Sequence, residues 1–196
     1  MTQKQIAQGA EAIILRDNNK VIKDRISKGY RIPELDEKLR KSRTKSEAKI
    51  IEKAGKIISS PKIMKVEKFK IEMEFIDGDK LSETLNSYPE KKQFEIMQML
   101  GQEVSKLHEN HIIHGDLTTS NTILKENKIF IIDFGLGYIS QRIEDKAVDL
   151  HLIKQALEAK HYQNWEKLFS AFVKGYTNKE ILERLKKVES RGRYKH

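Results

Sequence analysis

Two short motifs in the second half of the chain restrict its possible folds more than any other feature. In residues 114–121, the aspartate Asp116 stands five residues before Asn121. Residues 129–132 form an unbroken apolar run, and Asp133 follows it directly, before a Phe-Gly pair. Such a run is typical of a buried strand, so Asp133 would emerge where that strand ends. The two motifs therefore favour a fold in which three oxygen-bearing side chains converge.

This set of side chains suits phosphoryl transfer from ATP, which needs positioning and charge neutralisation more than covalent help. Asp116 would orient the attacking hydroxyl or water in the manner of a general base, which makes it the candidate catalytic residue. Asp133 and the amide oxygen of Asn121 would hold Mg²⁺, a hard ion that takes oxygen ligands and nucleotide phosphates. Taken alone, either motif is as easily a turn or a polar loop, but both in this order are harder to obtain by chance.

Length and composition fit an intracellular protein with one domain or one unit of two lobes. The chain has 196 residues, of which 38% are hydrophobic and 34% charged, enough for a real core under a charged surface. The absence of cysteine excludes disulfides, thiolate metal sites and cysteine nucleophiles. No apolar run approaches the ~18 residues of a membrane span, and the first residues lack a secretion signal. We therefore expect a cytoplasmic protein with no membrane partner.

The formal net charge of +9 is unevenly distributed. Residues 20–65 hold 15 Lys and Arg against 6 Asp and Glu, and residues 179–196 hold 7 against 3. Two basic segments suggest an anionic partner such as RNA, which basic side chains bind by displacing its counterions. The alternative is a solvated surface rich in Lys and Glu, as in heat-adapted proteins.

Hydrophobic periodicity predicts an α+β chain whose first part is rich in strands and whose second part is mostly helical. Strands are predicted over residues 12–15, 20–26, 62–66, 70–76, 112–113, 122–124 and 129–132. Helices are predicted over residues 33–58, 94–110, 147–160, 165–176 and 179–188. The polar stretch 77–79 breaks the pattern. We expect a lobe boundary there, with an N-lobe of about 1–76 and a C-lobe of about 77–196.

Over nearly its whole length the chain resembles the protein-kinase superfamily. The resemblance implies a minimal two-lobed protein-kinase-like fold that binds ATP and Mg²⁺. It makes Lys23 the lysine that meets the α- and β-phosphates, and Glu47 its salt-bridge partner, although Lys20 or Lys28 could take the place of Lys23. As an exposed pair, Lys23 and Glu47 would contribute less than ~1 kcal/mol, so their value would lie in orientation.

The same resemblance places the rest of the nucleotide site. Residues 6–12 stand where the family has its phosphate-covering loop, and residues 74–76 where its hinge reads adenine; a plain turn and an edge strand are the alternatives. His114 and Asp149 are expected to brace the catalytic loop. The residues expected to bind ATP are Ile6, Gly9, Ala10, Glu11, Ala12, Ile14, Lys23, Glu47, Glu74 and Ile76.

Two departures separate the chain from regulated protein kinases. Gly115 replaces the usual arginine before the catalytic aspartate, so the site that senses an activation-loop phosphate is missing. Only 13 residues separate Gly135 from Asp149, with no Ala-Pro-Glu among them. The platform that docks a peptide substrate is therefore mostly absent.

A narrower match involves residues 28–36, Arg43 with Glu47, the loop 114–121, residues 135–137 and the tail 190–193. These stretches resemble the signature of the small atypical kinase of the KEOPS complex. The resemblance implies an ATPase and serine/threonine kinase that supports threonylcarbamoyladenosine (t6A) modification of tRNA adenosine 37. Its implied partners are the threonylcarbamoyladenosine transferase subunit near the catalytic face, a small third subunit at the N-lobe, and tRNA.

The basic tail 190–196 is expected to bind tRNA through Arg191, Arg193 and Lys195. Two other functions remain open on the sequence. One is a free-standing serine/threonine kinase like the RIO group, which also uses a His-Gly-Asp loop. The other is a non-catalytic RNA-binding scaffold, against which the carboxylates Asp116 and Asp133 argue.

Overall fold

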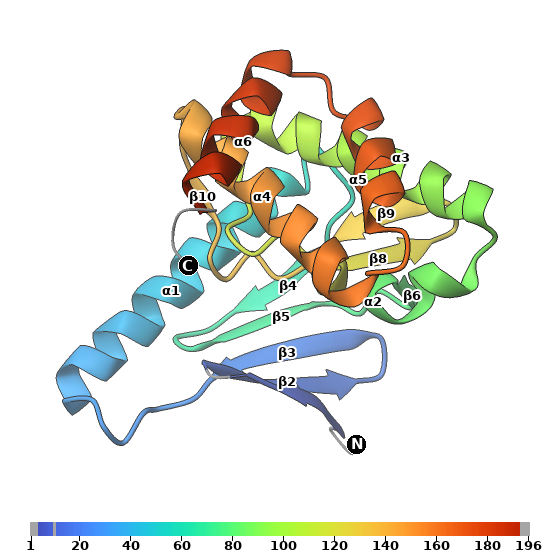
Figure 1. Cartoon of the computed structure of the whole chain (residues 1–196). Coiled ribbons are helices and arrows are strands. Elements are labelled where there is room, and N and C mark those ends of the chain that lie inside the picture. Colours follow the sequence, from blue (N-terminus) through green and yellow to red (C-terminus); the bar gives the residue numbers. More distant parts are fainter. Residues whose placement is uncertain (1–3, 10, 193–196) are drawn as a thin grey trace.

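The first part of the chain forms an antiparallel five-stranded sheet with one long helix beside it (Figure 1). The computed structural model describes residues 4–9 and 11–192. The strands are β1 (Lys4–Gln8), β2 (Ala12–Asp17), β3 (Lys20–Arg25), β4 (Ile63–Val66) and β5 (Lys70–Glu74). Their order is β1-β2-β3-β5-β4, so β5 lies inside the sheet and ends at Glu74, and the alternative of an edge strand over residues 74–76 is wrong.

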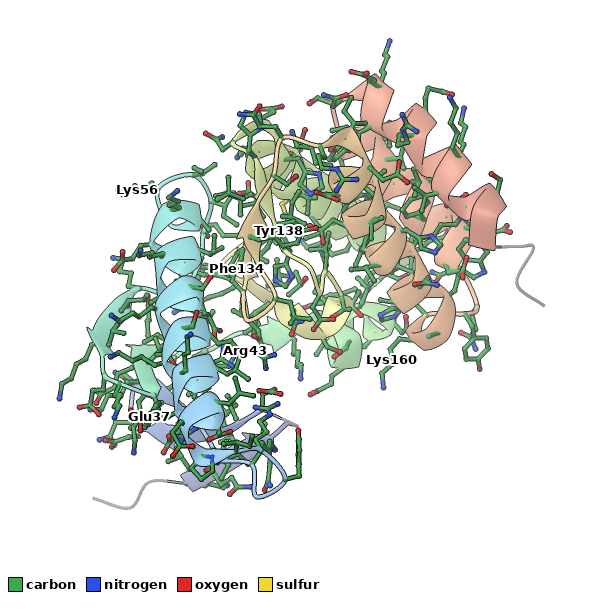
Figure 2. All side chains as sticks on the ribbon, turned by 90° about the vertical axis from the view of Figure 1, so that its left-hand side faces the viewer. Glu37, Arg43, Lys56, Phe134, Tyr138 and Lys160 are labelled. Atoms are coloured by element: carbon green, nitrogen blue, oxygen red, sulfur yellow. The ribbon has the colours of Figure 1, made fainter. Side chains whose placement is uncertain are left out.

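The long helix α1 (Pro33–Ala54) connects β3 to β4. Pro33 occupies the first turn, where its missing N–H costs no hydrogen bond, and acidic side chains follow in that turn. The helix ends four residues earlier than predicted, because the amides of Ile57 and Ile58 both turn back onto the carbonyl of Ala54. One face of α1 packs against the sheet and the other faces solvent (Figure 2).

The second part is built from helices and two small sheets (Figure 1). The helices are α2 (Leu81–Thr84), α3 (Glu90–Glu109), α4 (Ile143–Lys160), α5 (Trp165–Gly175) and α6 (Lys179–Gly192). Strands β6 (Asp79–Lys80), β8 (Thr122–Lys125) and β9 (Lys128–Ile131) form one sheet, and β7 (Ile112–Ile113) pairs with β10 (Tyr138–Ile139). The α+β prediction is confirmed, and the sequence missed β1, α2, β6 and β10.

Helices α3 and α5 cross at very close range. A Cβ atom on Gly101 would stand 2.1 Å from the carbonyl oxygen of Phe172, and one on Gly175 would stand 2.0 Å from that of Gln98. Only glycine permits this approach. The buried rings of Phe172 and Phe134 lie in one continuous apolar core that extends from α1 to α6. Leu117 and Phe134, which directly follow Asp116 and Asp133, belong to that core and anchor both segments.

The two parts of the chain are joined by contacts well away from the covalent connection. The amide of Ile131 in β9 donates to the carbonyl of Ser59, at 3.1 Å. A Cβ atom on Gly137 would lie 3.1 Å from Ile50 of α1, and Figure 2 shows Phe134 and Tyr138 beside the C-terminal half of that helix. In the described residues, no helix is long and apolar enough to cross a membrane.

Candidate active site

Three elements distant in sequence bring their charged side chains together. Lys23 comes from β3, Glu47 from the buried face of α1, and Asp133 follows β9. The Lys23 Nζ donates to the Glu47 Oε1 at 2.7 Å and to the Asp133 Oδ1 at 2.6 Å. Lys20 instead pairs with Glu72, so of these two lysines it is Lys23 that meets Glu47.

The Lys23–Glu47 pair is buried, so the expectation of an exposed pair is wrong. The side chain of Lys23 is 10% exposed and that of Glu47 is fully covered. Because solvent does not reach this pair to screen its charges, the pair restricts position far more than a surface pair does. Arg25 also reaches Glu47: its Nη2 donates to the Glu47 Oε2 at 2.5 Å. Sequence reasoning missed this second cation, although its two-residue spacing from Lys23 in a strand was visible.

Asp133 has a backbone φ of 60°, in the left-handed region that is unusual for a residue other than glycine. Its Oδ1 accepts from Lys23 and from the amide of Gly135, at 3.2 Å. Burial alone would raise the pKa of Asp133, but the nearby ammonium of Lys23 and the Gly135 amide outweigh it and lower that pKa below its usual value. The carboxylate is therefore kept in its charged form.

The loop before β8 holds Asp116 and Asn121 against each other. The Asn121 Nδ2 donates to both the carbonyl oxygen and the Oδ2 of Asp116, each at 2.9 Å. The carbonyl of Asn121 accepts from the amide of Ile132, at 3.0 Å, which ties this loop to the residue before Asp133. The carboxylate of Asp116 lies on an exposed residue and can reach a reactant from solvent.

Asp149 of α4 holds the same loop from the protein interior. Its carboxylate accepts from the backbone amides of His114, at 2.7 Å, and Gly115, at 2.9 Å. The His114 ring uses both nitrogens on backbone: Nε2 contacts the carbonyl of Ile132 at 3.0 Å, and Nδ1 accepts from the Asp116 amide at 3.2 Å. These contacts hold the backbone of the loop that carries Asp116, and the bracing role of His114 and Asp149 stays a prediction.

The predicted phosphate-covering segment is a hairpin between β1 and β2. The Gly9 amide closes the turn by donating to the carbonyl of Ala12, at 2.9 Å. Ile6 is exposed on β1 and Ile14 pairs with Lys23 across the β2–β3 ladder. Ala10 lies outside the described residues.

The carboxylate of Glu11 forms ion pairs with other side chains of the protein. Its carboxylate pairs with Arg31 at 3.0 Å and with Arg43 of α1 at 2.6 Å. Partial burial would raise the pKa of Glu11, but the two guanidinium groups more than offset this and lower it. Glu11 therefore fastens the tip of the hairpin to the long helix.

The predicted hinge follows β5, and part of its backbone is already in use. The amide of Glu74 donates to the carbonyl of Lys62, and that of Phe75 to the carbonyl of Asn19, each at 2.9 Å. A base in this position would therefore have to be read by carbonyl oxygens or by the amide of Ile76. Arg16 stacks over the Phe75 ring, 3.8 Å from its centroid, and stiffens the segment.

The donor set fits Mg²⁺ shared with a nucleotide better than a metal site made by protein alone. Among residues 4–9 and 11–192, no group of three or more His, Cys, Asp or Glu side chains could hold a metal ion. Asn121 spends its Nδ2 on Asp116, which leaves its Oδ1 as the ligand atom, and Asp133 keeps its Oδ2. Two hard oxygens plus phosphate oxygens suit Mg²⁺.

The tail falls largely outside the described residues. Arg191 belongs to α6 by its backbone, but its side chain is not described, and neither Arg193 nor Lys195 is described at all. The expected tRNA-binding role of these three residues stays a prediction.

Comparison with known proteins identifies the family to which this site belongs. The model of the RIO domain matches residues 16–151. The KEOPS complex subunit Bud32 of Pyrococcus abyssi is 42% identical over 98% of this chain and 96% of its own length. The chain belongs to the RIO domain family, in the group of KEOPS complex subunit Bud32. The predicted family is thereby confirmed.

Other relatives in this group differ in length. A probable serine/threonine-protein kinase BUD32 homolog of Archaeoglobus fulgidus is 39% identical over 95% of this chain and 94% of its own. A probable bifunctional tRNA threonylcarbamoyladenosine biosynthesis protein of Methanosphaera stadtmanae is 40% identical over 95% of this chain, which spans only 36% of that protein. Relatives of this kind support a kinase-type phosphotransferase.

Solved structures confirm the two-lobed protein-kinase-like fold. The Rio2 kinase of Chaetomium thermophilum, in its ADP/Mg²⁺–phosphoaspartate complex, has a TM-score of 0.58 at 16% identity and covers 100% of this chain and 72% of its own. The protein of the streptomycin–ATP–APH(2")-IIa ternary complex has a TM-score of 0.58 at 12% identity, over 97% of this chain and 91% of its own. At these identities the likeness concerns the fold.

Proposed function

We propose that this chain is the Mg²⁺-ATP-dependent ATPase and serine/threonine kinase subunit of a cytoplasmic KEOPS complex, where it supports t6A modification of tRNA adenosine 37. The observation that carries the proposal is the joint contact of Lys23 with Glu47 and Asp133, next to the bonded pair Asp116–Asn121. The names of its relatives, KEOPS subunits and t6A biosynthesis proteins, support the biological setting.

The nucleotide would lie between an N-lobe of about 1–76 and a C-lobe of about 77–196. Lys23 would meet the α- and β-phosphates, with Glu47 holding its ammonium in position. The β1–β2 hairpin would cover the phosphates through backbone groups other than the Gly9 amide, which is used within the turn. The backbone of Glu74 and Ile76 would read adenine. These roles rest on position and on the donors and acceptors that each segment presents.

Asn121 and Asp133 would hold Mg²⁺, which when bound neutralises phosphate charge during transfer. Asp116 would accept a hydrogen bond from water or from a Ser/Thr hydroxyl and take up its proton at the carboxylate. The side-chain amide of Asn121 orients the Asp116 carboxylate by a hydrogen bond. His114 and Asp149 fix the backbone of the loop that carries Asp116. The chain thus supplies position and charge, which is what this reaction requires of a protein.

The partners would be the threonylcarbamoyladenosine transferase subunit near the catalytic face, a small third subunit at the N-lobe, and tRNA. Two relatives are named bifunctional tRNA threonylcarbamoyladenosine biosynthesis proteins, and this chain spans about a third of each. Their names support a partner of this chain that corresponds to the remaining part of those proteins. A free-standing kinase of the RIO type is the second candidate, favoured by the RIO domain match.

The deciding experiment measures phosphate release from Mg²⁺-ATP by the full chain, alone and with the transferase subunit and tRNA. Mg²⁺-dependent release that rises when both partners are present supports the proposal. Efficient phosphorylation of a defined protein without partners would favour the free-standing kinase. No Mg²⁺-dependent release in any mixture would leave only the RNA-binding scaffold.

A further inference from the structure

Glu47 carries two cations, where a lysine–glutamate pair needs only one. Lys23 contacts its Oε1 at 2.7 Å and Arg25 contacts its Oε2 at 2.5 Å. All three residues are buried, with 8%, 4% and 1% of Lys23, Arg25 and Glu47 exposed. Both oxygens of a single carboxylate are therefore engaged by separate positive charges in the interior.

The position of Arg25 follows from strand geometry. It stands two residues after Lys23 on β3, so both side chains leave the same face of the sheet. Its backbone is fixed on both sides: its amide donates to the carbonyl of Phe69, and its carbonyl accepts from Arg40 of α1. The Nε of Arg25 is buried and has no hydrogen-bond partner among the described residues. A buried donor without a partner lowers the stability of the fold, so a stabilising role alone does not explain why Arg25 is buried here.

The charges around Lys23 indicate a role for Arg25 in the nucleotide site. Lys23 faces two carboxylates, Glu47 and Asp133, and could compensate only one of them. Because Arg25 neutralises Glu47, the ammonium of Lys23 remains available to Asp133 and to phosphate oxygens. We propose that Arg25 is a positioning residue that acts through Glu47 and releases the charge of Lys23 for the nucleotide.

This arrangement also fastens α1 to the sheet without help from the activation segment. Arg25 and Lys23 both connect β3 to the same side chain of α1. The helix is therefore held in its ATP-binding position by contacts within β3 and α1. No phosphorylation of the activation segment is needed for this, which agrees with Gly115 in place of the arginine that senses such a phosphate. The inference rests on the proposed function, because it assumes that Lys23 meets ATP phosphates.

The test is a double-mutant cycle on ATP affinity, measured by calorimetry with Mg²⁺-ATP. We expect Arg25→Met to weaken ATP binding at least tenfold in the parent chain and less than twofold in a Glu47→Gln background. Arg25→Lys, which keeps the charge, should restore binding to within about threefold of the parent. A Lys20→Met control removes another β3 cation, paired with Glu72, and should change affinity less than twofold.

An equal loss in both backgrounds, or no loss in a folded Arg25→Met protein, overturns the inference. Thermal unfolding of each variant separates a folding defect from weaker binding. If Arg25→Met does not fold, Arg25→Gln, which can still hydrogen-bond Glu47 without a charge, replaces it with the same two outcomes. Phosphate release by the parent is measured in parallel: its absence contradicts the proposed function, whereas the affinity cycle judges Arg25.

Discussion

The ionisation of Asp133 depends on Lys23. Burial raises the pKa of this carboxyl group, and the Lys23 ammonium with the Gly135 amide more than offsets it, so the folded-state pKa is lower than the unfolded one. A depressed pKa of this kind stabilises the fold above the unfolded pKa, and that contribution is lost as the pH falls through the folded pKa. The ammonium of Lys23 therefore favours the charged form of Asp133.

Replacing Lys23 should reverse that shift. In Lys23→Met the burial of Asp133 is no longer opposed by the ammonium, so we expect its pKa to rise above that of the parent. Carbon-detected NMR titration of the Asp133 carboxyl would show its midpoint at higher pH. Lys20→Met, which leaves Lys23 in place, should not move the midpoint. An unchanged Asp133 midpoint in Lys23→Met would contradict the cause assigned here.

Asp116 and Asp133 should fail in different ways when changed. Asp116→Asn removes the proton acceptor but keeps the shape and the Asn121 contact, so turnover should fall about 10²–10⁴-fold while ATP affinity stays nearly constant. Asp133→Ala should instead weaken Mg²⁺-dependent ATP binding. Phosphate-release kinetics and Mg²⁺ titrations of ATP binding separate the two. Equal turnover by Asp116→Asn and parent would remove Asp116 from the mechanism.

At the scale of the elements, the crossing of α3 and α5 depends on two glycines. A Cβ atom at position 101 would meet the Phe172 carbonyl oxygen at 2.1 Å, and a backbone atom cannot rotate away. Gly101→Ala should therefore push the helices apart and destabilise the protein by about 1–3 kcal/mol, read from denaturant unfolding. Gly29→Ala is the matched control, because no atom lies within 4 Å of a Cβ there. It should be neutral or slightly stabilising.

The solvent face of α1 carries a row of lysines: Lys38, Lys41, Lys45, Lys49 and Lys53, all exposed. Within the described residues, none of them makes an ion pair closer than 4.0 Å. Like charges four residues apart destabilise a helix by roughly 0.2–0.5 kcal/mol per pair. An anionic partner would bind these lysines and relieve their mutual repulsion. The basic character of residues 20–65 predicts such a partner.

A triple variant of Lys41, Lys45 and Lys49 to Glu should therefore weaken tRNA binding and flatten its dependence on salt. Removing three phosphate contacts lowers the slope of log K against log salt by about 2–3. Changing Lys91, Lys128 and Lys160 to Glu, on other elements, provides a control of equal charge. Filter binding over a range of salt concentrations would compare them. Equal slopes for both variants would mean that the lysines of α1 face solvent and do not contact tRNA.

The elements with strong periodicity were predictable from sequence, whereas the pairs that connect distant segments were not. Pro33 marked the start of α1 correctly, but its end depends on a local turn onto Ala54 that periodicity does not encode. Strands of two residues, such as β10, exist only because a partner strand is present. The motifs placed Asp133 near Asp116, yet the engagement of Glu11 by Arg43 needed the folded chain.

At the scale of the whole molecule, the shortened activation segment leaves apolar side chains uncovered beside the catalytic loop. Leu136, Tyr138 and Ile139 are 65%, 43% and 46% exposed. Apolar side chains gathered in this way on a surface are typical of a site for another protein. The transferase subunit is the partner that the proposed function supplies for this face.

Ile139→Glu should therefore weaken association with the transferase subunit at least tenfold, because a charge would have to be buried in the contact. Phosphate release by the chain alone should stay within twofold, since Ile139 lies on β10, pairs with Ile112 and is not one of the proposed ATP ligands. Tyr162→Glu, at a residue 70% exposed beyond α4, is the control and should bind the transferase normally. Calorimetry with the purified subunit measures both. Unaltered affinity in Ile139→Glu would mean that the transferase docks elsewhere, and the uncovered face beside the catalytic loop would then need a different partner.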